Sequence, residues 1–307
     1  MLKNRKDTIL IYGLLAAMLL TASALDRDFL SVKNLTNVVV TSLPFIIAAY
    51  GQTIAIISGG VDLSMGAMIS FATTICATKM RPDTPWGFLP GIFFAIAAGI
   101  LIGTANGTLA AVFHIQPLIA TLSTSLIIGG LALFMLPKPG GRIHMGLAKT
   151  VSKNSAAFLI LILVSVSLWL LLNRTKLGKA VYAVGGNENA AFSAGISIKK
   201  TKITAFAMVG LLASIAGIVM SCQMYSGDPT AGGPLTLRSI TAAVIGGTSF
   251  SGGKGRIECT LAGALLFSII NNILNLAGVS TFYQYVAQGL LLIFAIAVTS
   301  GKKRNAG

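Results

Sequence analysis

The chain has 307 residues, of which 54% are hydrophobic and only 10% are charged, and its mean hydropathy is +0.83. Across residues 84–137 no side chain carries a formal charge, apart from His114 when it is protonated. A water-soluble fold of this length could not cover so much apolar surface, whereas membrane spans of about 20 residues would use all of it. The composition excludes a soluble globular protein and predicts an all-α, polytopic membrane protein.

Glycine, cysteine and net charge narrow the class. The 34 glycines and the low aromatic content, 7%, indicate helices that pack closely against one another in lipid. Cys76, Cys222 and Cys259 lack metal or redox spacing, so we expect them to be buried apolar side chains. The net charge of +15 indicates basic residues retained in cytoplasmic loops rather than nucleic-acid binding. We expect no metal, no nucleic acid and membrane lipid as the surroundings.

Ten apolar stretches in one domain, residues 1–307, can be read as membrane spans, some of them short or broken. The first follows three basic residues and ends near Ala22, Ser23 and Ala24, which resemble a signal-peptidase site. It is nevertheless long enough to span, and the next stretch needs the orientation it sets. The predicted spans are 8–25, 34–58, 63–78, 91–113, 117–136, 154–173, 203–225, 237–251, 258–277 and 280–300.

The distribution of basic residues predicts the orientation. With ten spans and both termini cytoplasmic, 14 of the 23 lysines and arginines lie on the cytoplasmic side. Omitting the weakest span, 237–251, would reverse that excess, so the positive-inside rule favours ten spans. Two features fit less well. Arg238 lies at the mouth of the short span, and an outer loop carries Lys138, Arg142, Lys149 and Lys153.

The largest predicted cytoplasmic loop, residues 174–202, has a pattern of its own. Asn187 can cap a short helix that runs to Ala194, and Gly195 can end it. Such a helix, flanked by charge on the cytoplasmic face, could dock a soluble partner. From the residues alone, an ordinary solvated loop is an equally open interpretation.

The chain carries no recognisable catalytic or cofactor-binding motif, so we expect neither an enzyme nor a bound cofactor. Asp62 is the one acidic residue between closely spaced spans, within ISGGVDLSMG at residues 57–66. Gly59 and Gly60 can end one helix there, and Asp62 can accept backbone N–H groups at the start of the next. Broken helices of this kind line transport pathways. A helix cap, a gate or latch, and a proton carrier are three open roles for Asp62.

A similar string recurs at residues 246–253, where three glycines, one serine and one apolar residue align with residues 59–66. In so glycine-rich a chain this is weak evidence for duplication. The candidate gate and broken-helix residues from both strings are Gly59, Gly60, Asp62, Ser64, Gly66, Gly246, Gly247, Gly252 and Gly253.

Five strings together resemble one family: ISGGVDLSMG, GKAVYAVGGNENAAFSAGISIKKTKI, PTAGG, AAVIGGTSFSGGKGRI and NNILNLAGVSTFYQY. They resemble the ribose-type permease subunits of bacterial ATP-binding-cassette importers, in order and over nearly the whole chain. The loop at residues 178–198 resembles the cytoplasmic segment of that family that contacts the ATPase. The coupling residues implied are Gly178, Tyr182, Gly185, Gly186, Asn187, Glu188, Ala190, Ala191, Gly195 and Ile196.

The resemblance implies a multi-pass permease of the bacterial cell (inner) membrane that moves a monosaccharide inward, such as ribose or a similar pentose or hexose. Its expected partners are a tandem-cassette ATPase that binds ATP and Mg²⁺, a periplasmic or lipoprotein sugar-binding protein, and a second permease copy, identical or homologous. Two segments depart from the family. Leu235 to Arg238 replace its usual acidic residues, and the outer loop at 136–156 is shorter and more basic.

A proton- or sodium-coupled secondary transporter of a small neutral solute is the alternative, because such proteins also use broken helices. It predicts more than one intramembrane acidic group and leaves the 178–198 loop without a role. A channel or structural membrane protein is a third class, which would need no nucleotide at all.

Overall fold

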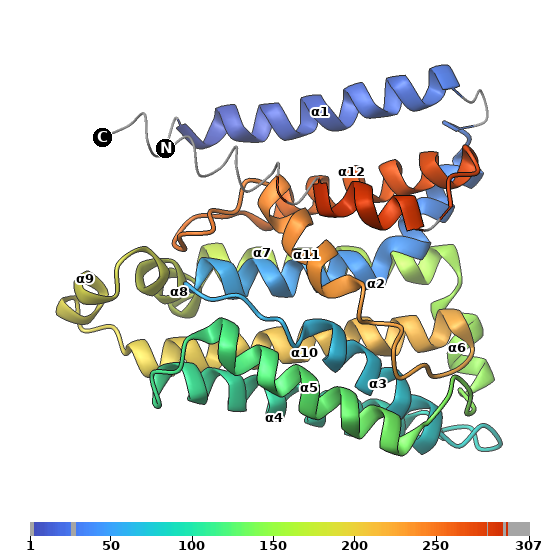
Figure 1. Cartoon of the computed structure of the whole chain (residues 1–307), viewed down its shortest axis with the longest axis horizontal. Helices are drawn as coiled ribbons and strands as arrows, with labels where there is room; N and C mark the ends of the chain where they lie inside the picture. Colours follow the sequence, from blue (N-terminus) through green and yellow to red (C-terminus); the bar gives the residue numbers. More distant parts are fainter. Residues whose placement is uncertain (1–2, 26–28, 281, 291–292, 294–307) are drawn as a thin grey trace.

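The computed structural model describes residues 3–25, 29–280, 282–290 and 293, and Figure 1 shows long helices running side by side. In this part of the chain the regular structure is helical, with one isolated bridge between Gly140 and Gly227. The helices are α1 Lys3–Leu25, α2 Val32–Ile57, α3 Met65–Lys79, α4 Leu89–Ala111, α5 Pro117–Met135, α6 Met145–Val151, α7 Asn154–Arg174, α8 Lys176–Gly186, α9 Glu188–Ser193, α10 Ile198–Met224, α11 Leu235–Ile245 and α12 Ile257–Leu276. Residues 282–290 are also helical.

Six helices in the described residues are long and apolar enough to cross a membrane: α2, α4, α5, α7, α10 and Ile257–Asn275 of α12. They correspond to six of the predicted spans, and the all-α prediction is confirmed. The predicted span 8–25 forms α1, which packs along α12. The predicted spans 63–78 and 237–251 form α3 and α11, with only 15 and 11 residues.

At 1.5 Å per residue α3 and α11 reach about 22 and 16 Å, short of the 30 Å of a hydrocarbon core. The prediction that the short span runs to residue 251 is wrong, because α11 ends at Ile245, ahead of the two glycines. The carboxyl terminus and ten of the 21 residues of the predicted span 280–300 lie outside the described residues. The ten-span count and the cytoplasmic termini therefore stay predictions.

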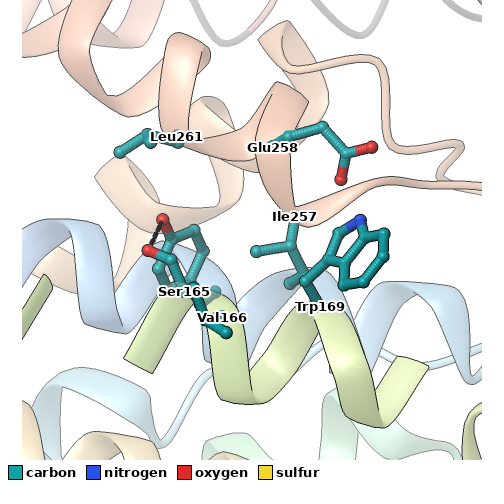
Figure 2. Close-up of a pocket in the computed structure, with 7 residues that line it drawn as sticks. Ser165, Val166, Trp169, Ile257, Glu258 and Leu261 are labelled. Carbon is teal, nitrogen blue, oxygen red and sulfur yellow. Dashed lines mark hydrogen bonds between the residues drawn. The ribbon is translucent and has the colours of Figure 1, made fainter. Parts of the chain in front are cut away.

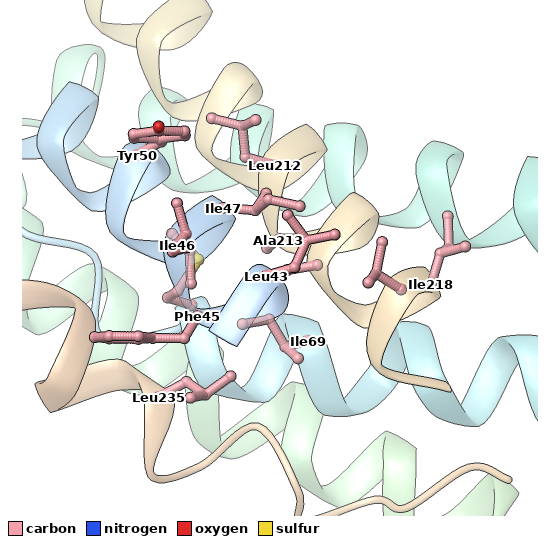
Figure 3. Packing of buried hydrophobic residues seen from close by; sticks show 14 of the residues in the cluster. Leu43, Phe45, Ile46, Ile47, Tyr50, Ile69, Leu212, Ala213, Ile218 and Leu235 are labelled. Carbon is pink, nitrogen blue, oxygen red and sulfur yellow. The ribbon is translucent and has the colours of Figure 1, made fainter. Parts of the chain in front are cut away.

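Helix α2 forms the centre of the bundle. Its residues from Leu43 onward are buried, and the helix packs against α7, α8, α10, α11 and α12. Figure 3 shows Ile46, Ile47 and Tyr50 of α2 packed between Leu212 of α10 and Leu235 of α11. A helix that is apolar all round needs such enclosure. The inner helix therefore contacts α8, α10 and α11, three of the elements that border the candidate site.

Small residues set the closest helix contact, between α4 and α10. Every fourth position on α4 is glycine or alanine and buried: Gly91, Ala95, Gly99, Gly103 and Gly107. A Cβ atom on Gly103 would overlap the Phe206 carbonyl, and one on Gly99 would overlap that of Gly210. This confirms the expectation from the glycine content. The three cysteines are likewise free and buried, as expected.

The contact between α4 and α10 gives a first prediction. Gly103→Ala should lower the melting temperature of the purified protein by about 3 °C or more, since overpacking costs about 1–3 kcal/mol. Gly130→Ala on α5 is the matched control, because a Cβ there meets nothing within 4 Å. Thermal unfolding in detergent, followed by size-exclusion chromatography, measures both. Equal melting temperatures for the two variants would contradict the close approach.

Candidate functional site: two helix breaks and a coupling junction

The first helix break separates α2 from α3. Helix α2 ends at Ile57, and Gly59 adopts a left-handed φ of 89°. The amides of Gly59 and Gly60 then donate back to the carbonyls of Ile56 and Ala55, each at 3.0 Å. The two glycines end the helix as predicted. Residues 60–64 then run as non-helical chain between helices until α3 begins at Met65.

Asp62 holds this non-helical segment in shape and is fully buried. Its Oδ1 accepts hydrogen bonds from Ser64 N at 2.7 Å and from Ser64 Oγ at 2.5 Å. The Gln52 amide, with its nitrogen toward the Asp62 carbonyl, bonds both the N–H and the C=O of Asp62 at 3.2 Å. The residue therefore supports the turn before α3. It does not cap the first turn of that helix, where Ser64 is the N-cap residue.

Polar side chains from two further helices fix the same segment. Asn106 of α4 donates through Nδ2 to Ser64 Oγ at 2.8 Å. Thr121 of α5 accepts from Leu63 N at 3.0 Å through its Oγ1. No lysine or arginine in the described residues forms an ion pair with Asp62. The Asp62 Oδ1 atom is thus held by neutral donors, while its Oδ2 atom is buried without a hydrogen-bond partner.

A second break, between α10 and α11, has the same local structure. Asp228 Oδ1 accepts from Thr230 N at 2.7 Å and from Thr230 Oγ1 at 2.8 Å. This is the arrangement of Asp62 and Ser64, repeated at the other broken helix. Asp228 and Thr230 were not among the predicted site residues.

The two breaks bond to each other reciprocally. Gly66 N donates to Thr236 Oγ1 at 3.0 Å, and Gly232 N donates to Ser70 Oγ at 2.9 Å. A Cβ atom on either glycine would overlap the carbonyl oxygen of the other. The same sequence pattern, Asp-x-Ser/Thr-x-Gly-x-x-x-Ser/Thr, begins at Asp62 and at Asp228. We call this contact the central junction.

This pattern corrects the duplication read from residues 59–66 and 246–253. Gly247, with a φ of 83°, ends α11 with the same backbone bonds with which Gly59 ends α2. Beyond that point the chain turns back into α12 and forms no second broken-helix segment. The similarity of the two strings is therefore limited to the helix ends, and the repeated break lies at residues 228–236.

The predicted coupling loop and both glycine strings meet at one end of the bundle, the left end in Figure 1. Gly253 N donates to the Ile57 carbonyl of α2 at 2.9 Å. Gly185 of α8 lies against the same carbonyl, so closely that a Cβ atom would overlap it. Tyr182 Oη donates to the Gly255 carbonyl at 2.8 Å. We call this set of contacts the coupling junction.

Burial raises the pKa of Tyr182 to about 12, so its hydroxyl stays protonated and remains the donor. On the other side of α8, Gly178 lies against the last carbonyls of α7, where a Cβ atom would overlap those of Leu171 and Leu172. Helix α8 of the predicted loop therefore packs against the end of α2 on one side and against the end of α7 on the other. It is not a loose solvated linker.

Helix α9 confirms the predicted short helix. Asn187 Oδ1 accepts from Ala190 N at 3.0 Å, and Gly195 follows with a φ of 76°. Ala191 points inward and is only 3% exposed, whereas Phe192 is 72% exposed. The outward face also carries Asn189 and Ala190, and Glu188 pairs with Lys202 at 2.5 Å. Because Ala191 is buried, only Ala190 of the two alanines can meet a partner. Ile196 N donates to the Ala191 carbonyl at 3.0 Å.

An apolar crevice of about 220 Å³ lies between α7 and α12 beside Tyr50 (Figure 2). Its polar groups are engaged except for Glu258 Oε2, which is buried without a hydrogen-bond partner. Tyr50 Oη and Ser165 Oγ bond each other at 2.7 Å, and Glu258 pairs with Arg256 at 2.5 Å. With Val166, Trp169 and Leu261 as walls, the crevice does not have the chemistry to bind a hydroxylated solute. Among the described residues no three metal-ligating side chains cluster together.

Comparison with known proteins agrees with this geometry. A family profile described as "Branched-chain amino acid transport system / permease component" matches residues 34–296. The ribose import permease protein of Escherichia coli (strain K12) is 34% identical over 313 residues, covering 98% of this chain and 95% of that protein. The chain belongs to the ribose-type permease family of ATP-binding-cassette importers.

Other members of this permease family are similarly close. The ribose import permease protein of Bacillus subtilis (strain 168) is 35% identical over 298 residues, covering 94% of this chain and 91% of that protein. The D-allose transport system permease protein of Escherichia coli (strain K12) is 32% identical, covering 96% and 91%. No solved structure matches the chain.

The coupling junction gives a second prediction. Gly185→Ala should strongly reduce ATP-dependent transport, because its Cβ atom would force α8 away from the Ile57 carbonyl. Gly186→Ala is the control, since its Cβ atom would meet only Gly253 Cα, at 3.9 Å. Uptake is measured with membrane insertion verified for both variants. If both variants lost uptake equally, or if neither lost it, the contact between α8 and the Ile57 carbonyl would not be the one that couples ATP to transport.

Asp62 gives a third prediction. Asp62→Asn should retain transport within a few-fold of the parent, because asparagine keeps the acceptor for Ser64 and no cation needs the charge. Asp62→Ala leaves two buried donors without partners, at about 1–3 kcal/mol each, and should lower both stability and uptake. The readouts are melting temperature and uptake. Complete loss of uptake in Asp62→Asn with unchanged stability would point to a titrating carrier instead.

Proposed function

We propose that this chain is the membrane subunit of an ATP-driven importer that carries a monosaccharide, ribose or a similar pentose or hexose, into the bacterial cell. The observation that carries the proposal is the coupling junction. There helix α8 contacts, backbone to backbone, the end of α2 and the turn that follows α11. Relatives that match over nearly the full length are named as ribose and D-allose permeases.

The proposed topology has ten spans with both termini cytoplasmic. Helices α8 and α9 and the turn at 246–256 lie at one end of the bundle, while α6 and the segments 136–144 and 225–234 lie at the other (Figure 1). The α8–α9 end carries Arg174, Lys176, Lys199, Lys200 and Lys254, which supports its cytoplasmic assignment.

Each end of the helix bundle has exposed residues that suit one of the expected partners. At the cytoplasmic end, exposed Phe192 on α9 suits insertion into a groove of a tandem-cassette ATPase, which would bind ATP and Mg²⁺ and perform all hydrolysis. At the opposite end, a periplasmic or lipoprotein sugar-binding protein would dock. The exposed basic side chains there suit an acidic surface: Lys138, Arg142, Lys149 and Lys153. A second permease copy, identical or homologous, would complete the path.

Ion-coupled transport has less support. A proton relay needs several acidic groups at depth. Among the described residues, Asp62 forms a turn that Asp228 forms equally well, and Glu258 is paired with Arg256. ATP would instead drive the change by favouring one arrangement of the helices over another.

The deciding experiment uses liposomes containing the permease and ATPase, with the sugar-binding protein outside and no ion gradient. Labelled ribose should enter only with ATP inside, and an uncoupler should have no effect. Phe192→Asp should abolish uptake and the stimulation of ATPase activity, whereas neighbouring Ser193→Ala should change neither. Uptake that needs an imposed proton or sodium gradient, with or without ATP, would overturn the proposed function.

A further inference from the structure

Three helical segments bring together a polar cluster at membrane depth, made of residues that belong to neither junction. Arg238 of α11 donates through Nε to Gln288 Oε1 at 2.8 Å, and Gln288 Nε2 donates to Asn271 Oδ1 of α12 at 3.0 Å. The Arg238 guanidinium lies 5.5 Å from the centre of the Tyr285 ring. Gln288 and Tyr285 belong to the helical segment 282–290. We call these four residues the polar wall.

The polar wall lies well away from the cytoplasmic end. Asn271 is 14 residues beyond Ile257, the first residue of α12, which corresponds to about 21 Å along the helix. Arg238 forms no ion pair with a carboxylate in the described part of the chain. An arginine and two amides at this depth need water or protein beside them, because lipid cannot solvate them.

The wall is accessible from outside the protomer. The Tyr285 side chain is 47% exposed, and Arg238, Asn271 and Gln288 are each partly exposed. The helical segment 282–290 also has a different, mainly apolar face, where Val286 and Leu290 are 62% and 63% exposed beside the exposed Tyr283. One short helix thus presents a polar surface and a lipid-compatible surface side by side. This division indicates that only one of them faces the bilayer.

The chemistry of the wall matches one class of solute. Guanidinium and amide groups supply several N–H donors and carbonyl acceptors, which suit the hydroxyl groups of a sugar, and the tyrosine ring can cover an apolar C–H face. The wall also adjoins the central junction, since Arg238 follows Thr236 by two residues on α11. A shift of the junction would therefore move the wall.

We infer that the polar wall lines the water-filled path and gives a hydroxyl-rich sugar weak, transient contacts on its way inward. The inference rests on the proposed function for the identity of the solute. That the face is wetted by water is a separate claim, which can be tested without any transport.

The test is thiol accessibility in the assembled importer. Cys76, Cys222 and Cys259 are replaced by alanine, and single cysteines are then introduced one at a time. Gln288→Cys and Tyr285→Cys place the thiol on the wall, whereas Leu290→Cys and Val286→Cys place it on the apolar face. With a small, membrane-impermeant thiosulfonate, the two wall variants should react much faster than the two apolar-face variants. If Gln288→Cys does not fold, the reaction rates of Tyr285→Cys and Val286→Cys are compared instead.

The charge of Arg238 supplies a second readout. An anionic thiosulfonate should react with the Gln288→Cys variant faster than its cationic counterpart, and adding Arg238→Gln should lower that rate ratio about tenfold. Lys254→Cys, in the cytoplasmic turn, should not react from outside. Wall thiols no more reactive than those on the apolar face would overturn the inference. So would labelling that occurs in separated protomers but is lost in the importer, because that would assign the wall to a subunit interface.

Measuring uptake tests whether the polar wall contacts the transported sugar. In the liposome assay Gln288→Leu should reduce ATP-driven ribose uptake by up to about tenfold, as expected for one lost hydrogen bond, while Leu290→Ala retains it. Unchanged uptake in Gln288→Leu would show that Gln288 makes no contact with the sugar. If uptake instead proves to be ion-driven while the wall thiols are reactive, the proposed function fails and the wetted path stands.

Discussion

The structure depends on the reciprocal bonding of two broken helices. Unpaired backbone groups are not tolerated within a bilayer, so a helix can break there only beside partners that replace its lost bonds. Each break supplies those partners for the other, because Gly66 bonds Thr236 and Gly232 bonds Ser70. Only glycine allows the two backbones to approach so closely. The half-helices α3 and α11 are therefore stable as a pair, each supplying what the other lacks.

The central junction is connected to the coupling junction by two segments of the chain. Helix α2 ends at the coupling junction and is followed by the Asp62 segment. Helix α11 begins at the central junction and leads into the turn whose Gly253 and Gly255 belong to the coupling junction. Gly185 and Gly253 contact the end of α2 through backbone atoms, which cannot change rotamer to absorb a displacement. A movement of α8 would therefore reach the central junction through the Asp62 segment and through α11, a contiguous physical route for coupling.

Much of this could be predicted from the sequence, for identifiable reasons. Long uncharged runs predicted the six long spans, and Asn187 with Gly195 predicted α9, because caps act locally. The break at Asp228 was missed, since Pro229 and Gly232 indicate an ordinary loop and its partner is distant in sequence. The inward position of Ala191 and the polar wall were also missed. Both depend on which helices come together, and no local pattern encodes that.

The matched turns also bear on the charge of Asp62. A buried carboxyl group without a counter-cation usually indicates a chemical role, such as proton transfer. Here Asp228 makes the same two hydrogen bonds at the other end of the junction, beside the exposed residue Thr230. Because a single geometric need accounts for both aspartates, the acidic side chain is explained by the turn it forms. This structural role of Asp62 supports the proposal that the energy for transport comes from a partner ATPase.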